Sequence, residues 1–135
     1  MSKTPRPIPI EMWGKDHWST FAYIETRCVD HKGIPELCRM RCDSKIHPML
    51  QDSRIAMANF GDKKYPTILK HGMTEESHDD WSCAEEMEHF GLLENVGTGI
   101  HPIFVLTEKG KNVAAQLRSH KMDGKNFASF EPKGI

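Results

Sequence analysis

The chain has 135 residues, of which 38% are hydrophobic and 27% are charged, and this size and composition are typical of one globular domain. No apolar run approaches the roughly 20 residues of a membrane span, and the opening MSKTPRPIPIEMW lacks the apolar core of a signal peptide, so we expect a cytoplasmic protein. The net charge of −1 conceals an asymmetry: from His71 to Glu108 there are nine acidic residues and no Lys or Arg, whereas the rest of the chain carries all 18 basic residues.

A proline-rich arm opens the chain. Prolines stand at positions 5, 7 and 9, and proline fits neither a helix interior nor a central strand, because it lacks an N–H group and has a fixed φ. The sequence therefore predicts an extended arm over residues 1–15, one folded domain over residues 16–121 and a tail over residues 122–135.

The first predicted helix covers about residues 16–31. Between Trp18 and Val29 the apolar residues recur at mostly helical spacing. Asp16 is the expected N-cap, because its carboxylate can accept a backbone N–H of the first turn, and Gly33 suits the C-terminal cap.

The middle of the chain is predicted to hold two short elements. Residues 35–42 suit a short strand, and residues 47–60 suit a second helix. Residues 61–72 form a basic loop or extended segment, which Pro66 interrupts.

The third predicted helix covers residues 78–90. Ser77 and Asp80 have the spacing of a capping box, in which each side chain binds the backbone amide of the other residue. One apolar stripe faces the core, formed by Cys83, Ala84, Met87 and Phe90. Gly91 then ends the helix.

A β-hairpin is predicted after this helix. Two apolar runs, at residues 92–96 and 100–106, flank Gly97-Thr98-Gly99. A last helix begins at Thr107, whose hydroxyl can cap it. The sequence thus predicts an α+β fold that is mainly helical, with a C-terminal hairpin followed by a helix.

Two short motifs resemble the second half of winged-helix domains, notably the MarR-like and PadR-like regulators. They are FGLLE at residues 90–94, which matches the end of the recognition helix, and LTEKG at residues 106–110, which matches the start of the next helix. The resemblance covers about residues 77–120. It implies a winged-helix fold in which the hairpin is the wing.

The resemblance also implies DNA binding. In these families the helix before the hairpin enters the major groove, the wing tip contacts phosphates, and the first and last helices commonly form a homodimer. This chain departs from the pattern, because the corresponding helix is acidic and its wing loop has no fixed cation. Carboxylates repel the phosphates that Lys and Arg would bind.

We therefore expect this surface to bind a protein with a basic surface, as inhibitors of the phage or plasmid type do when they occupy a nucleic-acid-binding groove. The predicted contact residues lie on the free face of the helix and on the wing: Asp79, Ser82, Glu85, Glu86, His89, Thr98 and His101. The alternative is a DNA-binding protein that uses basic residues elsewhere: Arg39, Arg41, Lys63, Lys64, Lys70, Lys109 and Lys111.

Cysteine and histidine residues between positions 28 and 47 could bind one zinc ion. Their spacing is C-x2-H-x6-C-x3-C-x4-H. Cys28 and His31 lie on the same side of a helix, and Cys38 and Cys42 could complete a tetrahedral site. The alternative is that Cys28 is a small core residue, that Cys38 and Cys42 are free thiols, and that the histidines lie on the surface.

An enzyme, dependent on zinc, is a further hypothesis. Asp30 with His31, or either His17 or His78 with Asp80, could serve as metal ligands or acid–base pairs. The sequence contains no nucleophile elbow, phosphate loop or H-E-x-x-H motif. We therefore expect a protein that acts by binding and not by catalysis.

Overall fold

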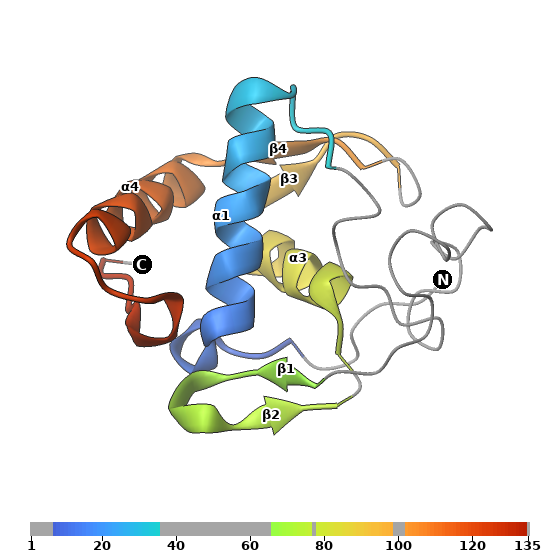
Figure 1. Cartoon of the computed structure of the whole chain (residues 1–135). Coiled ribbons are helices and arrows are strands. Elements are labelled where there is room, and N and C mark those ends of the chain that lie inside the picture. Colours follow the sequence, from blue (N-terminus) through green and yellow to red (C-terminus); the bar gives the residue numbers. More distant parts are fainter. Residues whose placement is uncertain (1–6, 36–65, 77, 99–101, 135) are drawn as a thin grey trace.

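The computed structural model describes residues 7–35, 66–76, 78–98 and 102–134 (Figure 1). The fold is α+β, as the sequence predicts, with three helices and two small antiparallel hairpins in the described part. The predicted strand at 35–42, apart from its first residue, and the predicted helix at 47–60 lie outside the described residues. No helix within the described ranges combines the length and apolar character needed to cross a membrane.

Helix α1 (Lys15–Asp30) is the centre of the arrangement. Figure 1 shows helix α4 (Glu108–Met122) on one side of it and helix α3 (Asp80–His89) on the other. The hairpin of β1 (Thr67–Ile68) and β2 (Thr74–Glu75) lies near the start of α1. The hairpin of β3 (Leu93–Asn95) and β4 (Phe104–Leu106) lies near its end.

The N-cap of helix α1 lies two residues before the expected cap. Gly14 is the N-cap, and a Cβ there would overlap the backbone of Leu69. Asp16, predicted as the N-cap, lies in the first turn, where its carboxylate accepts the Ile68 amide at 2.6 Å. That prediction is wrong because the side chain binds β1 and not its own helix.

The C-terminal end of α1 is as predicted. The amide of Gly33, at φ 82°, donates to the Arg27 carbonyl at 2.9 Å, which is the role of a C-terminal glycine cap. The Gly33 carbonyl in turn accepts the Phe104 amide of β4 at 2.8 Å. The end of α1 is thereby tied to the second hairpin.

Helix α3 begins with a capping box two residues later than predicted. The Asp79 carboxylate accepts the Ser82 amide at 2.7 Å, and the Ser82 hydroxyl accepts the Asp79 amide at 3.3 Å. Asp80, predicted as the acid of the box, is inside the helix, and Ser77 lies outside the described residues. Gly91 ends the helix at φ 81°, as expected.

The β3–β4 hairpin is confirmed, with Leu93 opposite Leu106 and Asn95 opposite Phe104. It is shorter than predicted, because the Asn95 side chain accepts the amides of Gly97 and Ile103 at the end of the strands. Thr107 caps α4 by accepting the Gly110 amide at 2.9 Å.

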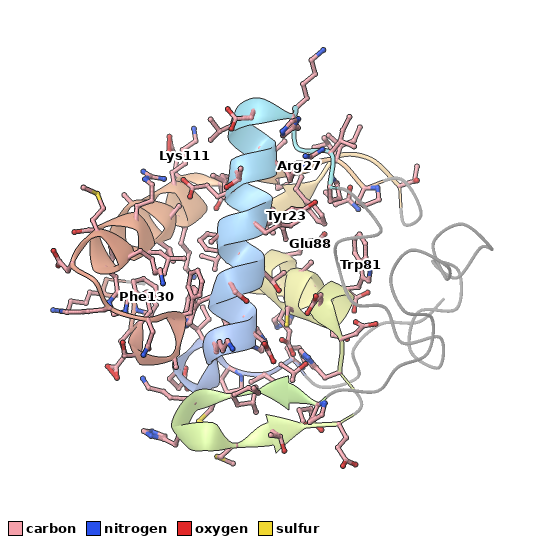
Figure 2. The ribbon with its side chains drawn as sticks, viewed as in Figure 1. Tyr23, Arg27, Trp81, Glu88, Lys111 and Phe130 are labelled. Atoms are coloured by element: carbon pink, nitrogen blue, oxygen red, sulfur yellow. The ribbon has the colours of Figure 1, made fainter. Side chains whose placement is uncertain are left out.

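The chain on both sides of the helices packs onto the core. Ile8 and Trp13 of the N-terminal arm are buried, and the 3₁₀ turn η1 (Ile10–Met12) lies between them. Beyond α4, Phe130 is buried edge-on against Trp18, with ring centroids 4.7 Å apart. Figure 2 shows Phe130 beside α1.

Candidate metal centre

Four side chains that can bind a metal meet where α1 packs against α3. His17 lies in the first turn of α1, His78 directly before the cap of α3, and Cys83 and Glu86 within α3. One possible ligand atom from each residue lies within 4.8 Å of the others. All four residues are at most 2% exposed.

The Glu86 carboxylate is the hub of this cluster. Oε1 lies 2.5 Å from Nε2 of His17, and Oε2 lies 2.9 Å from Nε2 of His78. Oε2 also accepts the backbone amide of Ile8 at 2.8 Å. Three donors from three separate segments therefore compensate the loss of water around this buried carboxylate.

Thr67 of β1 fixes the orientation of His78. Its hydroxyl donates to the His78 carbonyl at 3.1 Å, so its oxygen is left to accept from Nδ1 at 2.9 Å. The two ring nitrogens of His78 are thereby held between the Thr67 hydroxyl and the Glu86 carboxylate.

His17 has only one of its ring nitrogens bonded. Nδ1 is buried and has no hydrogen-bond partner in the described part of the chain, while the ring stacks on Trp13 with centroids 4.8 Å apart. Burial lowers the pKa of His17, and the nearby Glu86 carboxylate offsets only part of this effect. His17 is therefore a neutral imidazole whose Nε2–H donates to Glu86.

The pKa of Glu86 is subject to opposing effects. Burial alone raises the pKa of this carboxyl, but hydrogen bonds from His17 and His78 outweigh burial and hold it below its ordinary value. Glu86 is consequently ionised near neutral pH and available as an oxygen ligand.

The donor set fits a transition metal ion. Two imidazole nitrogens, a thiol sulfur and a carboxylate can form a tetrahedral site with bonds of about 2.0–2.3 Å, which separates neighbouring ligand atoms by about 3.3–3.7 Å. The observed separations of 2.5 and 2.9 Å at Glu86 are those of hydrogen bonds. Metal binding would therefore need the carboxylate to shift by roughly 1 Å.

Three residues predicted on a free acidic face are buried instead. Asp79 and Ser82 form the capping box, and Glu86 binds the two histidines. The expectation of a free face at these positions is wrong, because α3 is an inner helix with six buried residues among its ten. Glu85 is partly exposed, His89 and Thr98 are exposed, and His101 lies outside the described residues.

The cysteine–histidine set predicted between residues 28 and 47 is described only in part. The Cys28 thiol donates to the Phe104 carbonyl at 3.2 Å, burial raises its pKa, and His31 is exposed. Cys38 and Cys42 lie outside the described residues, so zinc binding by this set stays a prediction.

The sequence did not predict the cluster as a unit. The sequence offers His17 and His78 as functional residues with Asp80 as their partner, whereas the structure pairs both with Glu86. The available signal was the spacing of Cys83 and Glu86, three residues apart and hence on one side of a helix.

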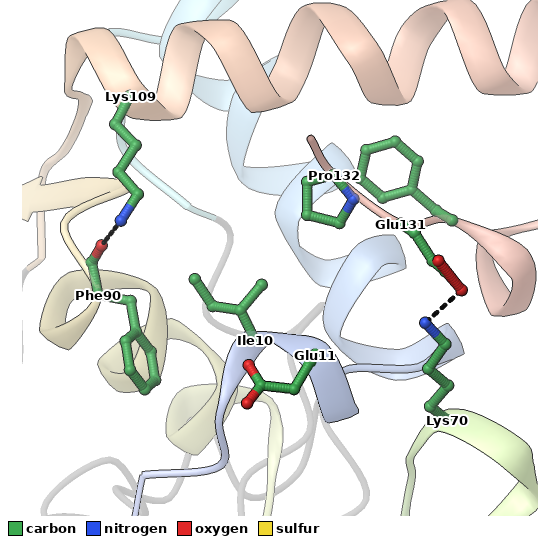
Figure 3. Close-up of a pocket in the computed structure, with 8 residues that line it drawn as sticks. Ile10, Glu11, Lys70, Phe90, Lys109, Glu131 and Pro132 are labelled. Carbon is green, nitrogen blue, oxygen red and sulfur yellow. Dashed lines mark hydrogen bonds and ion pairs between the residues drawn. The ribbon is translucent and has the colours of Figure 1, made fainter. Parts of the chain in front are cut away.

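A cleft of about 380 Å³ lies beside the arm (Figure 3). Its walls include Ile10, Phe90 and Phe130. The Lys70–Glu131 ion pair, with Nζ and Oε1 2.6 Å apart, lies at one end, and Lys109 donates to the Phe90 carbonyl at the other.

Comparisons with protein-family models, with curated proteins and with solved structures find no match for the chain. Its function is therefore inferred from the chemistry of its own residues.

Proposed function

We propose that the protein is a non-enzymatic binding module that carries one zinc ion at His17, His78, Cys83 and Glu86. The observation that carries this proposal is the convergence of four buried donor atoms within 4.8 Å. Two imidazoles, a thiol and a carboxylate are side chains that bind transition metal ions, and here all four are buried in one place.

Zinc suits this donor set better than magnesium or calcium, which prefer oxygen ligands. A thiolate from Cys83 and a carboxylate from Glu86 would balance the two positive charges of the ion in this buried place. The closed, four-donor arrangement favours a structural role, since catalytic zinc keeps one position open to substrate. The ion would join α1 to α3, and through Thr67 it would join both to β1.

Metal analysis of matched variants tests this proposal. Protein purified without added metal is expected to contain about one zinc per chain. Cys83→Ser should lower this content strongly because it removes the sulfur ligand, whereas Cys28→Ser should leave it unchanged. The reverse result would assign the ion to the predicted set that includes Cys28, and no zinc in either the wild type or the variants would refute the proposal.

A second proposal concerns the partner. We propose that the β3–β4 hairpin, which lies between α3 and α4, is a wing of winged-helix type used for association with a protein. On its outward face Val96 and Val105 are 61% and 43% exposed, and the carboxylate-bearing Glu94 lies opposite Val105. Exposed apolar groups beside an acid suit a partner whose surface combines apolar and basic side chains.

Adding one charge to each hairpin in turn tests whether a loss of partner binding is specific to the β3–β4 hairpin. Val105→Lys, which opposes the partner's basic side chains, should reduce co-purification of the partner at least tenfold, whereas Ile68→Lys, at a 38% exposed position of the other hairpin, should reduce it less than twofold. Equal effects would show that the wing is not the binding surface.

DNA binding has less support from the described basic residues. Lys70 pairs with Glu131, Lys109 donates to the Phe90 carbonyl, and Lys111 lies 4.0 Å from Glu108. These local contacts compete with phosphates for the ammonium groups. Duplex binding with a steep dependence on salt would nevertheless favour the DNA hypothesis over protein association.

A further inference from the structure

The N-terminal arm contacts the metal centre at two points. The Ile8 amide donates to Oε2 of Glu86 at 2.8 Å, and the Trp13 ring stacks on His17 with an interplanar angle of 10°. The Trp13 indole N–H donates back to the Ile8 carbonyl at 2.8 Å, which holds the two contact points together.

These contacts are buried and directed at the ligand side chains. Ile8 is 8% exposed and Trp13 is 1% exposed. The Ile8 amide shares Oε2 with His78, so it helps to determine which way the carboxylate faces. Groups that orient metal ligands in this way commonly change metal affinity by about 10–100-fold when they are lost.

We infer that residues 8–13 form the outer shell of the metal centre, so that zinc binding and docking of the arm are one coupled equilibrium. This inference rests on the proposed zinc site. If the docked arm increases zinc affinity, zinc must stabilise the docked arm by the same factor, because the coupling free energy is reciprocal.

The coupling extends to the cleft of Figure 3. Ile10 and Glu11, which line the cleft, lie between the two contact points of the arm. If the arm were released from Glu86 and His17, Ile10 and Glu11 would no longer line the cleft. Zinc occupancy would thereby control whether the cleft is formed.

Substitutions at Ile8 test the inference in the full-length chain. Ile8→Pro removes the amide hydrogen that Glu86 accepts, and it suits a segment that already has proline at positions 7 and 9. Ile8→Val and Ile8→Ala keep the amide and bracket the size of proline. Zinc affinity, measured by competition with a chelator, should fall at least tenfold for Ile8→Pro and less than threefold for both controls.

Hydrogen exchange supplies a readout that does not depend on affinity. Zinc should slow exchange of the wild-type Ile8 amide at least tenfold relative to chelator-treated protein, and exchange in helix α4, on the opposite side of α1 from α3, should change less. A wild type that binds no zinc refutes the zinc site and the coupling together. A wild type that binds zinc, with Ile8→Pro binding it equally well or with no change in Ile8 exchange, refutes the coupling alone.

Discussion

Replacing Glu86 by leucine should destabilise the protein even without metal. The substitution keeps a similar size but removes the acceptor for three buried donors, from Ile8, His17 and His78. Each buried donor left without an acceptor costs about 1–3 kcal/mol. Part of this loss is offset, because the histidines can change tautomer and the buried carboxylate no longer costs its own desolvation. We therefore expect the free energy of unfolding to fall by about 3–5 kcal/mol, as for other broken buried pairs.

Urea denaturation in excess chelator measures this effect, with tryptophan fluorescence and circular dichroism as independent probes. Glu88→Leu is the matched control, because Glu88 lies on the same helix but is exposed (Figure 2). It should change the free energy of unfolding by less than about 1 kcal/mol. Equal effects of the two substitutions would refute the reasoning, since they would place Glu86 on a solvated face as the sequence alone suggests.

Three further predictions concern acid, a glycine and the C-terminal segment. In chelator, the free energy of unfolding should fall as the pH drops below about 6.5 and again below about 4.5, because burial lowers the pKa of His17 and hydrogen bonds from the two imidazoles lower that of Glu86. In both pH ranges the unfolded chain therefore binds more protons than the folded chain. Urea midpoints that rise on acidification would contradict this prediction. Gly110→Ala should destabilise the fold by about 1–3 kcal/mol, because the added Cβ would overlap the Leu92 carbonyl oxygen, and this cost exceeds the gain from the higher helix propensity of alanine. An unchanged melting temperature would argue against this close contact. Phe130→Ala should cost about 3 kcal/mol in denaturant unfolding, whereas an unpacked tail would show almost no effect.

The elements that sequence analysis predicted well depend on local signals. Gly33 and Gly91 end helices, and Thr107 begins one, because backbone conformation and capping need only residues close in sequence. The capping box of α3 shows the limit of such signals. The sequence offers Ser77 with Asp80, and Asp79 with Ser82, and the structure has the second.

The candidate metal-binding cluster could not be predicted because it depends on contacts between distant segments. His17 and Glu86 are 69 positions apart, and only the packing of α1 against α3 brings them together. In sequence, Glu86 stands beside other acids and therefore resembles part of a solvated helix face. Its burial follows from the position of α3 inside the fold, which no local pattern of charges records.

The contact between Gly33 and Phe104 has a consequence for how the protein behaves in concentrated solution. Strand β4 is an outer strand of a two-stranded sheet, and such strands offer free amides to which another copy of the chain can add. The Phe104 amide is already used by the Gly33 carbonyl at 2.8 Å, and a Cβ at Gly33 would overlap the Phe104 carbonyl oxygen. This glycine therefore protects a strand edge from intermolecular pairing, and a larger residue there would favour aggregation as well as loss of stability.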